Sequence, residues 1–516
     1  MALMMSGALE DTICAIATPA GEGGIGIVRL SGVRALAIAE GIVQLRSGRP
    51  LASVVSHTLH LADVHLRSSS DTPPTETCAV APRGGNVFDE ALVVYMKGPR
   101  SFTGEDTVEI QSHGGWLILS LVCRACLAAG ARMAAPGEFT KRAFLNGRLD
   151  LSQAEAVLDT IRAKSAASLT VAQRQLRGEL AREVDAARDA LLRLLAQLEA
   201  GIDFVGEEIE ILARQELLRT IQDVGARIRR LGATAREGRW LREGARVVIT
   251  GRPNVGKSSL LNRLLKEERA IVTAVPGTTR DIIEEAISLD GVIIHLVDTA
   301  GIRSTDDALE REGIRRSRSA QKDADLQVIV IDGSTPLSDD DRGLIEQAAA
   351  GKHVIVINKA DLPMLVGPSD MKPGTMALPL SAKTGEGVEA LRSAIRSQLV
   401  GGGAETTDGV IVTNVRHQAA LDQAHGSLIQ AEESIRAGMP NELVAVDLRA
   451  AADSLGEITG AITTDEVLEQ ICSTFCIGKS GITPCHKGLT SSSSAGGMQA
   501  AKQRWHPPGW AQRRSS

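Results

Sequence analysis

The sequence predicts a multidomain protein in which an α/β domain is inserted into an all-α helical domain that follows an N-terminal α+β domain. A chain of 516 residues is too long for one ordinary core. Short β-branched runs occur in two separate regions, and Ala-, Leu-, Glu- and Arg-rich stretches with helical spacing lie on both sides of the second region. We therefore expect the two helical parts to pack together across the insertion.

The predicted N-terminal domain covers residues 1–149. Strand-like runs at 12–17, 25–30 and 91–96 are separated by Gly, Pro and Ser clusters, and a helical stretch lies near 117–129. This mixture is typical of an α+β fold.

The predicted helical domain has a first part at 150–242 and a second part at 403–479, with Leu191, Leu194 and Leu198 at helical spacing in the first. Thr463 with Glu466 predicts a capping box for the last helix.

The inserted domain is predicted at 243–402, where strands and helices alternate and predict a mostly parallel sheet. After it a Gly-rich spacer begins at 401. Residues 480–516 are rich in Ser, Gly and basic side chains and contain no acid, so we expect a disordered tail.

Composition excludes few function classes. Apolar residues make up 43% and the formal net charge is −6, so any RNA contact needs a local patch or a partner. The sequence has no run of about 18 uncharged apolar residues, which favours a cytoplasmic protein without membrane contact. The seven cysteines suggest reduced thiols, and Cys123 with Cys126 lies in an apolar helix, where core packing is expected rather than metal or redox chemistry.

A phosphate-binding loop is predicted at residues 251–258, which fit the pattern G-x-x-x-x-G-K-S/T between a strand at 246–250 and a helix at 259–265. The glycines let backbone N–H groups close around phosphates. Lys257 can reach the β- and γ-phosphates, and Ser258 can ligate magnesium.

Four further motifs follow in the order that a GTPase needs, each close to the end of a predicted strand or on a loop. Thr279 can ligate magnesium and sense the γ-phosphate, and Asp298 reaches the magnesium shell. The Asp361 carboxylate can accept hydrogen bonds from the N1 and N2 hydrogens of guanine, and adenine does not offer these two donors. The predicted GTP-binding residues are Asn254, Val255, Gly256, Lys257, Ser258, Ser259, Thr273, Ala274, Val275, Pro276, Gly277, Thr278, Thr279, Asp298, Thr299, Ala300, Gly301, Asn358, Lys359, Ala360, Asp361, Ser381, Ala382 and Lys383.

The predicted GTPase lacks one familiar catalytic group. Ile302 occupies the place where a Ras-type protein has the glutamine that orients the attacking water. An aliphatic side chain cannot do this, so another group must, and a positive charge equivalent to an arginine finger, worth ~10³ to 10⁵ in rate, is also required.

The chain from Asp11 to Lys479 resembles the MnmE (TrmE) family of GTPases, which modify the wobble uridine of certain tRNAs. The motifs that carry the resemblance are residues 17–21 (ATPAG), 101–106 (SFTGED), 136–144 (PGEFTKRAF), 146–155 and 475–479 (FCIGK). The resemblance implies an N-terminal domain that dimerises and binds a tetrahydrofolate derivative as one-carbon donor, and a GTPase domain that dimerises across potassium. It also implies a homodimer that forms a heterotetramer with the FAD-dependent MnmG (GidA), acts on tRNA, and adds aminomethyl or carboxymethylaminomethyl at uridine C5.

The same resemblance assigns site residues. Glu310 would be the catalytic residue that positions the water, although by itself it reads as a solvated helix charge. Magnesium would bind Ser258 and Thr279. Potassium would bind Asn254, Thr273, Val275 and Thr278, and the folate would bind Arg29, Glu105, Arg148 and Lys479.

Three alternatives stay open or are set aside. Residues 21–26 match G-x-G-x-x-G with Glu40 downstream, but the following segment is predicted as a strand, so a folate-side loop or a plain turn is favoured over NAD binding. A ribosome-assembly GTPase of the Era or Der type that binds rRNA would need a second GTPase domain or a C-terminal KH module. A scaffold that uses GTP only to organise its partner is the third possibility.

Overall fold

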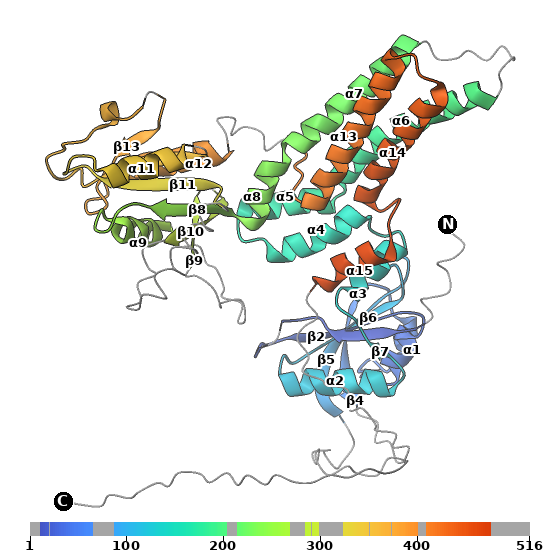
Figure 1. The fold of residues 1–516 in the computed structure, drawn as a ribbon. Coiled ribbons are helices and arrows are strands. Elements are labelled where there is room, and N and C mark those ends of the chain that lie inside the picture. The colour runs from blue at the N-terminus through green and yellow to red at the C-terminus, as the bar shows by residue number, and fades with distance from the viewer. Residues whose placement is uncertain are drawn as a thin grey trace, which may run out of the picture. The chain divides into compact units, whose positions relative to one another are not determined.

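The computed structural model describes residues 11–19, 21–65, 87–203, 214–268, 284–289, 291–298, 324–349, 351–372, 374–400 and 409–475 (Figure 1). It confirms the predicted multidomain class. The spacer at 401 and the tail at 480–516 lie outside these residues. Among the described helices, none is long and apolar enough to cross a membrane.

The N-terminal sheet has the strand order β3-β4-β5-β6-β2-β1-β7 in the described part of the chain. Its neighbours pair antiparallel except β1 with β7. The elements are β1 Ile13–Ile16, β2 Gly26–Ser31, α1 Ala35–Glu40, β3 Val43–Leu45, η1 Leu51–Ser53, β4 Leu59–His65, β5 Val87–Met96, β6 Thr107–Ser112, α2 Trp116–Ala128, β7 Arg132–Met133 and α3 Glu138–Leu145.

Helices α1 and α2 share one apolar core with this sheet, formed by side chains such as Val28, Ile110 and Val122. Cys123 and Cys126 are fully buried in this core, as expected. Residues 26–31 form a strand rather than a helix, which removes the helix N-terminus that a dinucleotide fingerprint at residues 21–26 would require.

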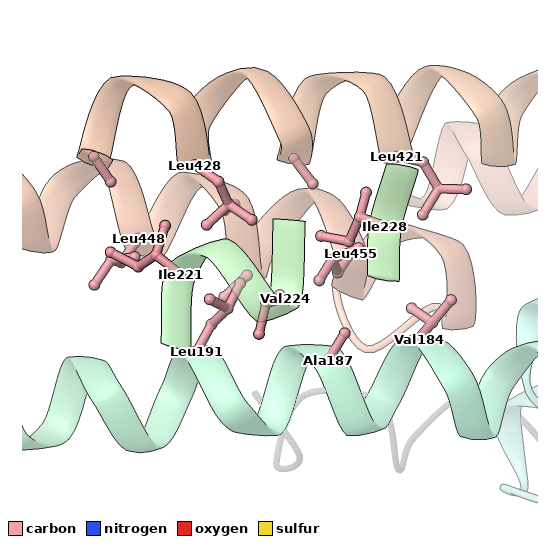
Figure 2. Packing of buried hydrophobic residues seen from close by; sticks show 14 of the residues in the cluster. Val184, Ala187, Leu191, Ile221, Val224, Ile228, Leu421, Leu428, Leu448 and Leu455 are labelled. Atoms are coloured by element: carbon pink, nitrogen blue, oxygen red, sulfur yellow. The ribbon is translucent and has the colours of Figure 1, made fainter. Parts of the chain in front are cut away.

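The helical elements come from both sides of the insertion, and four of them share one hydrophobic core, as predicted. Figure 2 shows Leu191 of α6, Ile221 of α7, Leu428 of α13 and Leu448 of α14 converging in this core. The helices are α4 Leu151–Arg162, α5 Ala166–Leu176, α6 Glu179–Asp203, α7 Arg214–Ala233, α8 Ala235–Glu243, α13 Val415–Arg436, α14 Asn441–Thr459 and α15 Asp465–Ser473.

The capping box predicted for the last helix, Thr463 with Glu466, is wrong: the N-cap lies one residue later, and the residue three positions after it is Val467, whose side chain cannot complete a box. Helix α15 begins at Asp465, and its N-cap is Thr464, whose Oγ1 accepts a hydrogen bond from the Val467 N–H at 3.4 Å. Thr463 lies outside the helix and donates its hydroxyl to the Thr464 carbonyl. Thr463 and Thr464 have the same side chain, so the side chain alone does not decide which of them is the N-cap. Thr464 has the extended backbone angles that an N-cap requires.

The second sheet has the strand order β13-β12-β11-β8-β10-β9 within the described residues. All neighbours are parallel except the β9–β10 hairpin, which confirms the mostly parallel prediction. The elements are β8 Ala245–Thr250, α9 Lys257–Glu268, β9 Glu284–Leu289, β10 Val292–Asp298, β11 Leu326–Asp332, α11 Asp339–Ala348, β12 His353–Asn358, η2 Pro368–Asp370, β13 Ala377–Pro379 and α12 Val388–Val400.

Both faces of this sheet are covered. Alternate residues of β11 enter two different cores: Val328 and Val330 pack with α9 and α12, whereas Ile329 and Ile331 pack with α11. The carboxyl ends of β8, β11 and β12 therefore meet at one edge of a buried sheet, which is where α/β folds place ligands.

Candidate nucleotide-binding site

The phosphate loop follows β8 and has the predicted strand–loop–helix context. Gly251 and Gly256 have φ angles of 149° and 99°. A Cβ on Gly251 would lie 2.3 Å from the Val330 carbonyl oxygen, and one on Gly256 would lie 2.1 Å from Asn358 Nδ2. The loop therefore crosses β11 and β12 so closely that only glycine fits at these two positions.

Lys257 opens α9 and is almost completely buried. Its Nζ donates to the carbonyl oxygens of Gly251 at 2.8 Å and Arg252 at 2.7 Å. The ammonium is thus held inside the curve of the loop, among the backbone groups that cradle phosphates in proteins with this motif. Ser258 and Ser259 follow it and are exposed in the first turn of α9.

Asn358, the last residue of β12, ties three motifs together. Its Nδ2 donates to the Val255 carbonyl oxygen at 2.7 Å, and its Oδ1 accepts from the Ala382 N–H at 3.0 Å. The side chain is 3% exposed. Asn358 therefore positions the phosphate loop and the 381–383 loop relative to each other.

Lys359 forms an ion pair with Asp332. The sequence predicted the lysine as a site residue but not the aspartate. The Lys359 Nζ lies 2.5 Å from Asp332 Oδ2, and the Ser334 hydroxyl donates to Asp332 Oδ1 at 2.6 Å. Burial raises the pKa of Asp332, but Lys359 and Ser334 outweigh it and hold the pKa below its usual value. The available signal was a carboxylate at the end of an apolar strand next to β12.

Asp361 is the predicted guanine acceptor. The Ser381 hydroxyl donates to its Oδ1 at 2.6 Å and accepts from the Thr384 N–H at 3.1 Å. This hydrogen bond lowers the pKa of Asp361, so the exposed carboxylate stays ionised. An ionised carboxylate accepts hydrogen bonds only, as recognition of two guanine N–H groups requires.

Arg252 extends from the phosphate loop to α11. Its Nε donates to Asp341 Oδ1 at 2.9 Å, and Asp341 is buried and bonded reciprocally to the N-cap Ser338. The sequence did not predict this contact. It directs Arg252 to α11 and thereby ties the phosphate loop to that helix.

Several predicted site residues lie outside the described part of the chain. These are Thr273, Ala274, Val275, Pro276, Gly277, Thr278, Thr279, Thr299, Ala300, Gly301, Glu310 and Lys479. Asp298 is the last residue of β10, so it stands at the same sheet edge as the phosphate loop.

Of the three described folate candidates, Arg29 and Arg148 contact the loop at residues 101–105. Arg29 bonds to Glu109, with Nη2 to Oε1 at 2.6 Å, and its guanidinium lies 6.0 Å from the ring centre of Phe102. Arg148 Nε donates to the Ser101 carbonyl oxygen at 3.4 Å. Glu105 belongs to the loop itself.

Glu105 already has partners within the protein. It accepts from the Ser31 hydroxyl at 2.7 Å and from Arg142 at 3.2 Å. Arg142 is 1% exposed and also pairs with Asp11 and Glu138, at 2.6 and 3.1 Å. Burial lowers the pKa of Arg142, but these carboxylates raise it above its ordinary value, so the guanidinium stays charged. Arg142 lies in the motif at residues 136–144, and no sequence pattern predicts this role for it.

The parallel sheet, the glycine loop that holds Lys257 and the Asp361–Ser381 pair together define the class of this protein as a P-loop GTPase. The model described as "MnmE helical domain" matches residues 151–476, and the model described as "GTP-binding protein TrmE N-terminus" matches residues 12–148. The chain belongs to the MnmE (TrmE) family, as the resemblance indicated.

Relatives in this family match the chain over their full length. One from Symbiobacterium thermophilum, named tRNA modification GTPase MnmE, is 47% identical over 474 residues, which cover 91% of this chain and 100% of the relative. Another with the same name, from Chloroflexus aurantiacus, is 48% identical over 475 residues, with the same two shares.

Proposed function

We propose that this chain hydrolyses GTP in order to modify tRNA. In this proposal it acts with the FAD-dependent MnmG (GidA) and uses a tetrahydrofolate one-carbon unit to install aminomethyl or carboxymethylaminomethyl at C5 of the wobble uridine. The observation that supports it most is that the chain spans the full length of relatives named tRNA modification GTPases. The hydrogen bonds of Ser381 to Asp361 and of the Ala382 N–H to Asn358 add support for a guanine site.

The nucleotide site supports the GTPase half of the proposal. Lys257 binds the phosphates, Asp361 selects guanine, and Asn358 sets the distance between the two loops. The exposed hydroxyl of Ser258, one residue after Lys257, is a hard oxygen ligand that suits magnesium, with Thr279 as its proposed partner.

Potassium and Glu310 are proposed to complete the site. Asn254 has a φ of 64° and is exposed in the phosphate loop, where its amide oxygen is a suitable donor for a monovalent cation alongside Thr273, Val275 and Thr278. Such a cation supplies positive charge near the phosphates, the role of an arginine finger elsewhere. Ile302 is aliphatic and cannot position the water, and the family resemblance gives this role to Glu310.

The folate is proposed to bind near the loop at residues 101–105, with Arg29, Arg148 and Lys479 as cations for its acidic tail. The assignment is supported by the loop that the candidates share: Arg29 lies over Phe102, Arg148 donates to the Ser101 carbonyl oxygen, and Glu105 belongs to the loop. Because Glu105 is paired with Arg142, a pteridine would share this carboxylate with an internal guanidinium. A homodimer formed through the N-terminal domain belongs to the same proposal.

The test is nucleoside analysis of total tRNA from cells that lack this protein. Loss of the C5-modified wobble uridines, restored by the wild-type gene but not by Lys257→Ala, is the expected result. Lys266→Ala changes an exposed lysine on the same helix and is the matched control, which should restore modification. Normal wobble uridines with accumulating ribosome precursors would instead favour a ribosome-assembly GTPase of the Era or Der type.

A further inference from the structure

The carboxylate of Asp332 has partners on both of its oxygens at the edge of the nucleotide site. Its Oδ2 lies 2.5 Å from Lys359 Nζ, and its Oδ1 accepts from the Ser334 hydroxyl at 2.6 Å and from the Ser334 N–H at 3.0 Å. The Asp332 side chain is 10% exposed, and that of Lys359 is 33% exposed. A carboxylate that is largely buried needs such partners, so the ion pair is held in one geometry.

The two residues of this ion pair come from neighbouring strands. Asp332 is the last residue of β11, and Lys359 follows Asn358, the last residue of β12 and the register partner of Asp332. The ion pair therefore joins the residues that follow β12, which include Asp361, to the end of the adjacent strand.

The backbone after Asp332 supports the same segment. The Gly333 N–H donates to the Asn358 carbonyl oxygen at 2.9 Å, and the Gly333 carbonyl oxygen accepts from the Leu365 N–H at 2.8 Å. A Cβ at position 333 would lie 2.8 Å from Ile357 Cγ2 and 3.0 Å from the Asn358 carbonyl oxygen. Residues 332–334 are thus bonded closely along the segment at 358–365.

Lys359 has a backbone conformation that a lysine rarely adopts. Its φ is 66°, in the left-handed region, which is unfavourable for a residue with a Cβ. Such residues persist where the surrounding structure holds them, and they cluster at ligand sites. The Ala360 N–H donates to the Leu380 carbonyl oxygen at 3.1 Å and fixes the backbone, while Asp332 fixes the side chain.

Lys359 and Asp361 lie in the same turn, two residues apart. A base bound by the Asp361 carboxylate would therefore lie beside the apolar stem of Lys359, and lysine stems cover apolar surface while the charged end binds elsewhere. A free lysine side chain has many rotamers, and ordering it on binding reduces affinity.

We propose that Asp332 is a positioning residue for guanine-nucleotide binding. It fixes the Lys359 side chain in the free protein, so that nucleotide binding does not have to order it. Asp332 acts through Lys359 and does not itself contact the nucleotide. The inference rests on the guanine site proposed above.

Calorimetric titration of the full-length protein with GDP, together with steady-state GTP hydrolysis, tests this role. Asp332→Asn keeps an oxygen for Ser334 but removes the charge that holds Lys359. We expect Kd for GDP and KM for GTP to rise about tenfold, because a hydrogen bond to a charged group is lost. The change in kcat should be much smaller, because no contact of the phosphate loop is removed, and a general loss of stability would not separate KM from kcat in this way.

A double-mutant cycle makes the result specific. Lys359→Met keeps the apolar stem, removes the charge and should weaken GDP binding to a similar extent. Adding Asp332→Asn to Lys359→Met should have no further effect, because both changes remove the same ion pair. The control is Glu389→Gln, which breaks an exposed ion pair with Arg392 in α12 of the same domain and should bind GDP like the wild type.

Two results would overturn the proposal: wild-type GDP affinity in Asp332→Asn, and losses that add in the double variant. Titration of the wild type with ADP separates this failure from that of the site itself. Equal affinity for ADP and GDP would refute the guanine site, and the role of Asp332 with it.

Discussion

The side chain of Asn358 bonds to the Val255 carbonyl and the Ala382 N–H, and so fixes the spacing between the phosphate and guanine loops. In Asn358→Ala both groups lose a partner inside a buried site, at a cost of about 1–3 kcal/mol each. We expect a lower melting temperature and weaker GDP binding together. Thermal unfolding with and without GDP measures both, and a variant with wild-type stability would contradict this role.

Asp361 is exposed, and its proposed role is to bind the base rather than to stabilise the fold. Asp361→Asn should weaken selection of guanine, because an amide presents one acceptor where guanine needs two. The melting temperature of the free protein should stay nearly unchanged, because the side chain is exposed. Competition of GTP and ATP for a fluorescent GDP analogue measures the effect. Equal affinity of the wild type for ATP and GTP would refute the assignment of this site.

Glu310 lies outside the described residues, and its proposed role rests on kinetics. Glu310→Ala should lose at least about a hundredfold in kcat for GTP hydrolysis with nearly intact nucleotide affinity, because a water-positioning group acts in the transition state. Single-turnover hydrolysis and GDP titration separate the two quantities. A fall in affinity large enough to explain the whole defect would mark Glu310 as structural.

Arg142 and Asp341 show which site residues the sequence could not reveal. The phosphate loop and guanine motifs are local in sequence, so their spacing predicted them and their strand ends. Arg142 pairs with Asp11, and Arg252 pairs with Asp341, across 131 and 89 positions of chain. Such pairs depend on tertiary structure, and a single sequence contains no periodicity that reports them.

At the scale of elements, prediction succeeded for type, while several boundaries differ by one or more residues, such as α9, which begins at Lys257 rather than at 259. Strand β2 and helix α2 were predicted from β-branched and apolar runs. The cap of α15 was misplaced by one residue because Thr463 and Thr464 are chemically equivalent, and the path of the preceding chain decides which one has extended backbone angles.

The buried Glu155 of α4, which pairs with Arg416 at 3.0 Å and His417 at 2.6 Å, predicts a pH dependence of stability. Burial raises the pKa of Glu155, but His417 and Arg416 outweigh it and lower the pKa to about 2. The pKa in the folded state lies below the value of about 4.3 in the unfolded state, so the ion pair stabilises the fold above pH 4.3. This stabilisation, on the order of 3 kcal/mol, is lost as the pH falls towards 2.

Urea unfolding of the wild type and Glu155→Gln tests this dependence. The difference in midpoint between them should be large at pH 7 and shrink as the pH is lowered from about 4.3. The control is Glu183→Gln, which removes a half-exposed ion pair between Glu183 of α6 and Arg227 of α7. Its effect on the midpoint should be small at both pH values. A Glu155→Gln difference that is constant with pH would show that its charge does not stabilise the fold.

At the scale of the whole molecule, the helical core closes across α8 and the inserted α/β domain. The Val412 N–H donates to the Thr234 hydroxyl at 3.0 Å, so the chain ends on either side of residues 235–411 already meet. Replacing residues 236–409 by a short Gly–Ser linker should leave a folded helical domain that no longer binds GDP. Far-UV circular dichroism and GDP titration measure these outcomes, and loss of cooperative unfolding would contradict them.

The shared core of α6, α7, α13 and α14 also bears on how the protein is made. A ribosome that adds ~5–20 residues per second needs on the order of ten to thirty seconds to pass from the end of α8 to the start of α13. During that interval the apolar faces of α6 and α7 have left the ribosome while their partner helices do not yet exist. We therefore expect the nascent chain to expose an unfinished helical core while the α/β domain is made, so that aggregation is a greater hazard during synthesis than in the mature fold.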